Sequence, residues 1–153
     1  MGVDMKKLLA TTALIASVTA GAANAGEWNG AYAGVFATHL TPGNTTGVGI
    51  QLGYNIDQGN LVYGGEVDFS KFAAGSLAEI HGRIGTKLGS NVLGFGLLGL
   101  GMNTSGSPRY WVAGVGAEYQ FSQGWGLRAD LSHLQIFGGA SSNNIRLGVV
   151  RNF

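Results

Sequence analysis

Apolar and polar residues alternate with a period of two through most of the chain after residue 26. Stretches rich in Gly, Asn, Asp and Ser, which favour turns, separate the alternating segments. No segment beyond residue 26 shows the 3.6-residue period of a helix, so the pattern predicts an all-β protein. The eight predicted strands cover residues 27–39, 46–56, 61–72, 77–88, 92–102, 110–121, 125–136 and 145–153.

The first 25 residues follow a different pattern. Lys6 and Lys7 precede an apolar stretch that ends near Ala20, and the small residues Ala23 and Ala25 flank Asn24. This order is typical of a bacterial secretory signal peptide, and the apolar stretch is short for a membrane anchor. We therefore predict a signal peptide over residues 1–25, from Met1 or from the alternative start Met5, and an exported domain over residues 26–153.

On most predicted strands one face carries the charges and the other is apolar. On the seventh, for example, Arg128 and Asp130 alternate with Leu127 and Leu131. The first and fifth strands are ambiguous, since both of their faces are apolar or glycine. A period of two does not say which face is inside, because a soluble lipocalin-like barrel has an apolar interior and a transmembrane barrel the reverse.

Composition favours the transmembrane arrangement. Only 11% of the residues are charged, whereas 28 of 153 are glycine. Many glycines share the polar register, where a narrow eight-stranded interior needs small residues beside long ones. The charges of that register nearly balance, as expected for an enclosed ion-pair network. The predicted lumen network consists of Glu66, Asp68, Glu79, Arg83, Lys87, Glu118, Arg128, Asp130 and Arg146.

Aromatic residues gather near the strand ends, where the two membrane interfaces of a transmembrane barrel select them. The strands are also long enough to cross a bilayer at a tilt. The predicted interface aromatics are Trp28, Tyr54, Tyr63, Trp111, Tyr119, Phe121, Trp125 and Phe153.

Three short motifs carry a resemblance to a known family. WNGAYAG at residues 28–34 resembles a W-x-G-x-Y-x-G first strand, YGGEVD at 63–68 a Y-G-G-E-x-D third strand, and GAEY at 116–119 a G-x-E-Y segment. With the terminal Phe153, they make the chain similar to small eight-stranded outer-membrane β-barrels of Gram-negative bacteria. The closest likeness is to the opacity-type "porin family" surface proteins, which are themselves similar to the OmpA transmembrane barrel.

The resemblance implies an outer-membrane location, with outer-membrane lipid and lipopolysaccharide around the barrel. It also implies that the barrel-assembly machinery recognises the last strand through Phe153. Two features depart from the family pattern. Arg151 stands where an aromatic or apolar residue is usual, and the outer loops are short, which argues against an elaborate adhesin or receptor role.

Candidate catalytic residues are few. Small barrel enzymes that deacylate lipid A resemble this chain in size and place a His-x-Ser pair on a late strand, but His133 is followed at the +2 position by Gln135. Ser132 lies on the opposite face, so no local nucleophile–base pair forms. We expect His81 to belong to the lumen network. The G-x-G-x-x-G match at residues 94–99 has no following helix and is not a dinucleotide site.

The sequence thus predicts an eight-stranded antiparallel up-and-down transmembrane β-barrel with a plugged polar lumen. We expect a non-enzymatic protein with a structural or surface-interaction role, no cofactor or metal, and no nucleic-acid partner. One alternative is a soluble lipocalin-like binding barrel with Leu127 and Val149 inside and Arg128 outside. Others are a lipid A-modifying hydrolase centred on His133 and a small ion-conducting pore.

Overall fold

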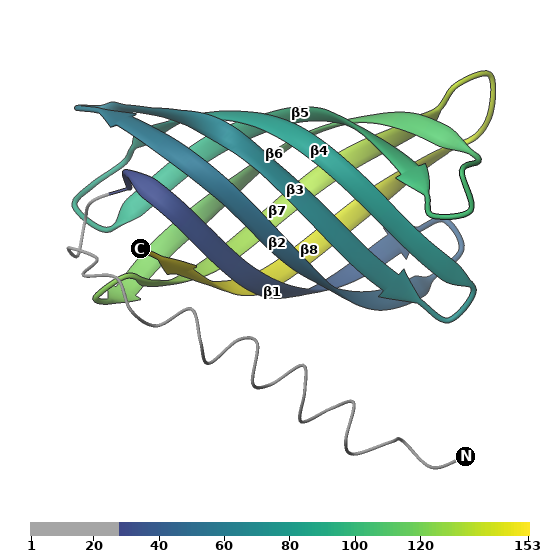
Figure 1. Ribbon diagram of the computed structural model, residues 1–153, viewed down its shortest axis with the longest axis horizontal. Coiled ribbons are helices and arrows are strands. Elements are labelled where there is room, and N and C mark those ends of the chain that lie inside the picture. The colour runs from purple at the N-terminus through teal and green to yellow at the C-terminus, as the bar shows by residue number, and fades with distance from the viewer. Residues whose placement is uncertain (1–27) are drawn as a thin grey trace, which may run out of the picture.

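The computed structural model describes residues 28–153 of the chain, so the predicted signal peptide lies outside the described residues. These residues form eight β-strands (Figure 1). The strands are β1 (Gly30–Thr41), β2 (Thr45–Gln58), β3 (Leu61–Phe72), β4 (Gly75–Lys87), β5 (Val92–Asn103), β6 (Arg109–Ser122), β7 (Trp125–Ile136) and β8 (Ser141–Asn152). Within residues 28–153, no helix has the length and apolar character needed to span a membrane.

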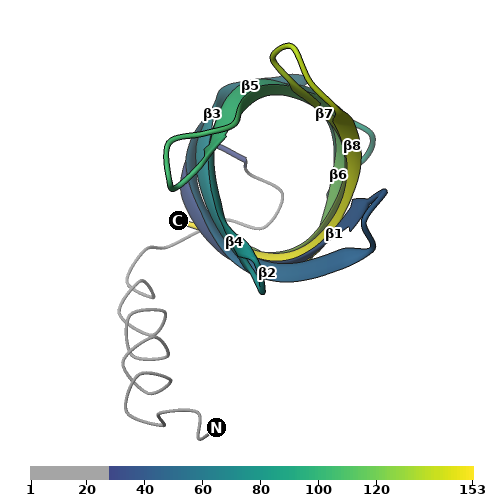
Figure 2. The ribbon, with the colours of Figure 1, turned by 90° about the vertical axis from the view of Figure 1, so that its right-hand side faces the viewer.

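The strands close into a barrel in which each one pairs antiparallel with the next and β8 pairs with β1. The view along the barrel shows the closed ring (Figure 2). With eight strands, the start of β1 and the end of β8 lie at the same end, together with the turns at 59–60, 88–91 and 123–124 (Figure 1). We call this the terminal end and the other, with connections 42–44, 73–74, 104–108 and 137–140, the loop end.

The predicted closed antiparallel barrel of eight strands is confirmed, and most strand boundaries differ by only a few residues. The largest difference in the first residue of a strand is at β8, which begins at Ser141 and not at the predicted residue 145. Ser141 to Asn144 look like a turn because they are small and polar. In the barrel this segment pairs with both β7 and β1, and the Asn144 side chain faces inward and accepts a hydrogen bond from Thr38 at 2.5 Å.

The two faces of the wall are those of a transmembrane barrel. Leu127 and Leu131 on β7 are 47% and 57% exposed, whereas Arg128 and Asp130 between them are 2% and 4% exposed. The soluble alternative, which places Leu127 inside and Arg128 outside, is therefore wrong. On the ambiguous strand β5, the structure turns Phe95 and Leu97 inward and leaves Gly94, Gly96 and Leu98 on the outer face.

Site-directed spin labelling tests this orientation. A nitroxide at Leu131 should contact lipid, with high accessibility to oxygen and low accessibility to a water-soluble nickel chelate. A nitroxide at the adjacent Ser132, which is buried in the lumen, should be immobilised and shielded from oxygen. Higher oxygen accessibility at 132 than at 131 would contradict the orientation of the wall.

Candidate functional site in the barrel lumen

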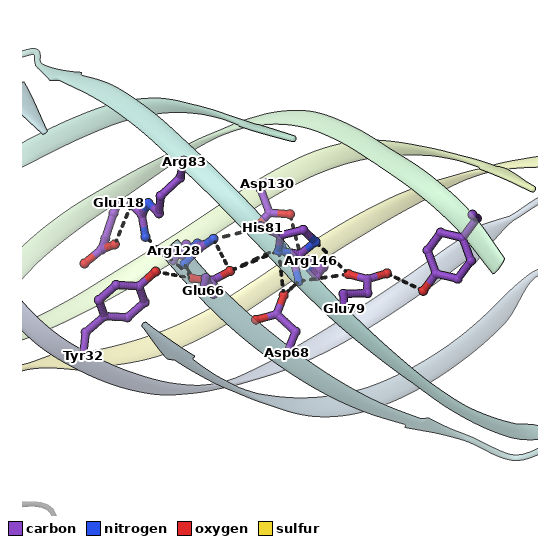
Figure 3. A network of polar contacts seen from close by, with 11 residues as sticks. Tyr32, Glu66, Asp68, Glu79, His81, Arg83, Glu118, Arg128, Asp130 and Arg146 are labelled. Atoms are coloured by element: carbon purple, nitrogen blue, oxygen red, sulfur yellow. Dashed lines mark hydrogen bonds and ion pairs between the residues drawn. The ribbon is translucent and has the colours of Figure 1, made fainter. Parts of the chain in front are cut away.

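Two neighbouring strands supply most of the acidic groups inside the barrel. β3 contributes Glu66 and Asp68, and β4 places His81 directly opposite Glu66 and Glu79 directly opposite Asp68. Because directly paired residues of antiparallel strands project from the same face, the register gathers three carboxylates and an imidazole in one part of the lumen. Figure 3 shows these side chains with their basic partners.

Glu66 and Arg128 form the central contact. Arg128 Nη2 donates to Glu66 Oε1 at 3.0 Å, and Arg128 Nη1 contacts Oε2 in a bidentate arrangement. Tyr32 Oη donates a further hydrogen bond to Glu66 Oε2 at 2.6 Å. Glu66 is on β3 and Arg128 on β7, four strands away in either direction around the ring, so this pair spans the lumen.

Arg146 on β8 makes a second crossing toward the loop end. Its Nε donates to Asp130 Oδ1 on the neighbouring β7 at 2.8 Å, and its Nη1 contacts Asp68 Oδ2 on β3. Asp130 also lies 3.5 Å from Arg128 Nε. The two arginines and their three acids thus form one continuous network between the opposite walls (Figure 3).

His81 occupies the centre of the acidic group. Its Nδ1 lies 3.3 Å from Asp68 Oδ2 and 3.6 Å from Glu66 Oε1, and its Nε2 lies 3.1 Å from Glu79 Oε2. A neutral imidazole has only one N–H, whereas here both ring nitrogens face carboxylates. The geometry therefore fits the doubly protonated ring, which adds a third positive group to Arg128 and Arg146.

Glu66, Asp68 and His81 also place one ligand atom each within 4.8 Å of one another, which is close enough for a metal ion. The two carboxylates already contact the guanidinium groups of Arg128 and Arg146. A divalent cation would have to displace these arginines or sit beside their charges. The arrangement fits a balanced ion-pair network better than a metal centre.

Aromatic rings pack against two of the lumen arginines. The Arg83 guanidinium lies 4.2 Å from the Phe95 ring centroid and 5.2 Å from that of Tyr32, and Arg128 approaches Phe95 at 4.7 Å. Cation–π contacts of this kind are strongest in desolvated surroundings. Tyr32 and Phe95 were not predicted as lumen residues because both lie on the ambiguous strands.

Glycines in the lumen make room for these rings. A Cβ added at Gly53 would overlap the Tyr32 ring, and one added at Gly116 would overlap Phe95. The outward-facing Gly65 differs, since a Cβ there would make only an ordinary 3.7 Å contact with a backbone oxygen. The glycines of the polar register are therefore a packing requirement of the filled lumen.

The structure brings together all the residues of the predicted lumen network except Lys87. Arg83 Nη2 lies 3.6 Å from Glu118 Oε2, which joins Glu118 to the network from the terminal side. Lys87 instead forms a separate ion pair with Asp57, at 2.7 Å, in the mouth of the terminal end. The reason is its place at the last position of β4, beyond the reach of the central acids.

Trp28 also differs from its predicted place at the membrane interface. It is 1% exposed and packs inside the terminal end with Val62 and Leu93. Trp28 has the same parity as Tyr32 and Phe36, which β1 turns inward, and its side chain lies on their side of the wall. Tyr54, Tyr119, Phe121 and Trp125 are exposed on the outer face, while Tyr63, Trp111 and Phe153 are half-buried.

Arg151, the departure from the family pattern, packs on the outer aromatic residues of the terminal end. Its guanidinium lies 5.4 Å from the Trp125 ring centroid and 5.9 Å from that of Phe153. It also donates to the backbone oxygen of Gln123 in the β6–β7 turn. The cation is thereby accommodated within an aromatic belt.

Replacing Arg128 by Met tests the crossing ion pair. We expect Arg128→Met to lower the free energy of unfolding by about 3–5 kcal/mol, because Glu66 is left buried with fewer compensating charges. Lys87→Met, which breaks the partly exposed pair with Asp57, should cost less than about 1 kcal/mol. Urea unfolding in detergent micelles measures both. Equal losses would contradict the central role of Glu66–Arg128, whereas partial recovery in the double variant E66Q/R128M would support it.

The packing of the aromatic rings predicts that alanine destabilises the barrel at one glycine and not at another. Gly53→Ala should destabilise the barrel by about 1–3 kcal/mol, since the Tyr32 ring that it meets is held by Glu66. Gly65→Ala, on the lipid face, should leave stability unchanged or slightly higher. The same unfolding assay compares the two, and a neutral Gly53→Ala would show that the lumen is loosely packed.

The closed eight-stranded wall, the apolar outer face and the buried charge network define a small outer-membrane β-barrel. The chain belongs to the outer membrane protein beta-barrel domain family, whose model matches residues 10–153. This membership places the protein in the outer membrane. No curated protein sequence matches the chain.

Several solved structures share the fold. A de novo designed transmembrane β-barrel matches with a TM-score of 0.67 at 17% identity, covering 83% of this chain and 98% of that one. The N-terminal β-barrel domain of Pseudomonas aeruginosa OprF matches with a TM-score of 0.66 at 16% identity, covering 82% and 98%. The outer-membrane enzyme PagL matches with a TM-score of 0.62 at 10% identity, covering 80% and 99%. These likenesses concern the fold, which serves several functions.

Proposed function

We propose that the chain is a non-enzymatic integral outer-membrane protein with a plugged lumen and a structural or surface-interaction role. The observation that carries the proposal is the Glu66–Arg128 pair across the lumen, extended by Arg146 and His81. An eight-stranded barrel is just wide enough for side chains to fill it. The rings of Tyr32 and Phe95 occupy further space beside the ion pairs.

The short connections at the loop end support a modest surface role. Each connection at the loop end has only two to five residues between strands. Such loops present little surface for a large partner, so the main contacts in this proposal are with outer-membrane lipid and lipopolysaccharide. Recognition of β8 and Phe153 by the barrel-assembly machinery belongs to the same proposal. The protein's role is then to occupy and support the outer membrane.

The hydrolase alternative centres on His133, which lies on the outer face of β7 near the loop end. Its Nδ1 is 2.9 Å from Asn143 Oδ1, so an amide and not a carboxylate orients the ring. Gln135 at the +2 position contacts the backbone oxygens of Ile136 and Gly139. Ser132 is buried on the lumen face. The likeness of fold to PagL therefore comes with Gln135, and not a serine, at the position two residues after His133.

Conductance in planar bilayers tests the plugged lumen. We expect the wild-type barrel to show no stable single-channel openings, and the double variant E66A/R128A to show them, since it removes both halves of the crossing pair. Heat-modifiable gel mobility of each variant serves as the control for folding. Stable openings of the wild-type protein would overturn the plug in favour of the small pore.

A separate measurement addresses catalysis. Lipid A extracted from cells that express the protein should carry the same acyl chains as lipid A from cells that express His133→Ala. Loss of an acyl chain with the wild-type protein alone would overturn the non-enzymatic proposal.

A further inference from the structure

The outer face contains a long groove with a volume of about 1060 Å³. Small outward residues form its floor, namely Gly82 on β4, Gly96 on β5 and Ala113 on β6. Apolar side chains line its edges, including Leu98 and Leu131, which are 64% and 57% exposed. The floor therefore has room for an apolar chain between ridges that face the membrane.

The register gives the groove a direction. The groove lies between two rows: Leu98, on one edge, is in register with Gly82, Ala113, His133 and Asn143, and Leu131, on the other edge, is in the next row with Gly96. The strands of a closed barrel are tilted, so a row across them climbs from one membrane interface to the other. The groove begins beside Tyr63, near the terminal end of β3, and ends at Asn143 and Thr41 near the loop end.

The loop-side end of the groove is polar. His133 contacts Asn143 and lies 5.8 Å, centroid to centroid, from the Trp111 ring. Arg109, an exposed residue, lies two positions beyond Trp111 on the same face of β6. The groove thus joins an apolar floor to the polar groups of His133 and Asn143, while Arg109 lies further along β6, outside the groove lining.

Charge on the outer face has one sign. Every side-chain carboxylate of residues 28–153 lies in the lumen or its mouth, where it contacts Arg, Lys, His, Tyr or Asn. The outward-facing charged residues of this range are the cations Lys71, Arg109 and Arg151. A negatively charged group at the polar end of the groove would therefore meet no carboxylate on the outer face of residues 28–153.

We propose that this groove binds one anionic, phosphate-bearing membrane lipid. An acyl chain lies on the floor formed by Gly82, Gly96 and Ala113, and the phosphate lies at His133 and Asn143, on the side toward Arg109. The inference rests on the proposed non-enzymatic function, because the lipid is held and not cleaved.

A larger side chain on the floor of the groove tests whether the acyl chain of the lipid lies there. Ala113→Leu should reduce the number of lipid molecules retained by the purified barrel several-fold, measured by native mass spectrometry after exchange into palmitoyl-oleoyl phosphatidylglycerol and mild delipidation. Ala117→Leu is the matched control, since Ala117 is also outward on β6 but lies outside the groove. Equal retention by the two variants would overturn the proposal.

The headgroup site needs its own variants. Wild-type protein should retain phosphatidylglycerol over phosphatidylcholine with the same acyl chains, and R109Q/H133Q should lose this preference. Lys71→Gln, which removes an outward cation on β3 at the same end of the barrel, should keep it. No preference in the wild type, or an equal loss in Lys71→Gln, would overturn the site.

The mass of the released lipid separates the two proposals. Intact phosphatidylglycerol supports both of them. A retained lipid that has lost one acyl chain would support the groove but overturn the non-enzymatic function.

Discussion

The ion pair between Glu66 and Arg128 joins opposite walls of the barrel, and both side chains are almost fully buried there. A buried charge without a partner is costly, so each arginine in the lumen requires a carboxylate across from it or beside it. Asp68, Asp130 and Arg146 continue the pattern toward the loop end, and Arg83 and Glu118 continue it toward the terminal end. The rings and glycines of the lumen fit around these pairs.

Closure of the wall is the condition for this arrangement. In hydrocarbon every backbone N–H and C=O must find a partner within the protein, and the pairing of β8 with β1 removes the last free edges. The same closure turns alternate residues of all eight strands toward one narrow space. A single geometric requirement therefore produces both the lipid-facing surface and the crowded polar interior.

Period-two alternation predicted the strands and most of the lumen network, because a strand places successive side chains on opposite faces. Arg128, Asp130 and Arg146 were found from this pattern alone. Tyr32 and Phe95 were missed because their strands carry apolar or small residues on both faces. Trp28 was placed wrongly because the faces of the first strand are ambiguous in sequence, so its inward parity with Tyr32 and Phe36 does not show.

The sequence by itself determined the number of strands, their antiparallel order and the separation of polar from apolar faces, since these depend on local alternation and on short turns. Only the tertiary structure decided which charges meet. Glu66 pairs with Arg128, which is 62 positions later in the sequence, and Asp68 pairs with Arg146, which is 78 positions later. Such pairings follow from the register and diameter of the closed ring, which no single strand encodes. The groove from Gly82 to His133 likewise exists only because the register sets Gly82, Gly96 and Ala113 of neighbouring strands beside larger residues such as Leu98 and Val115.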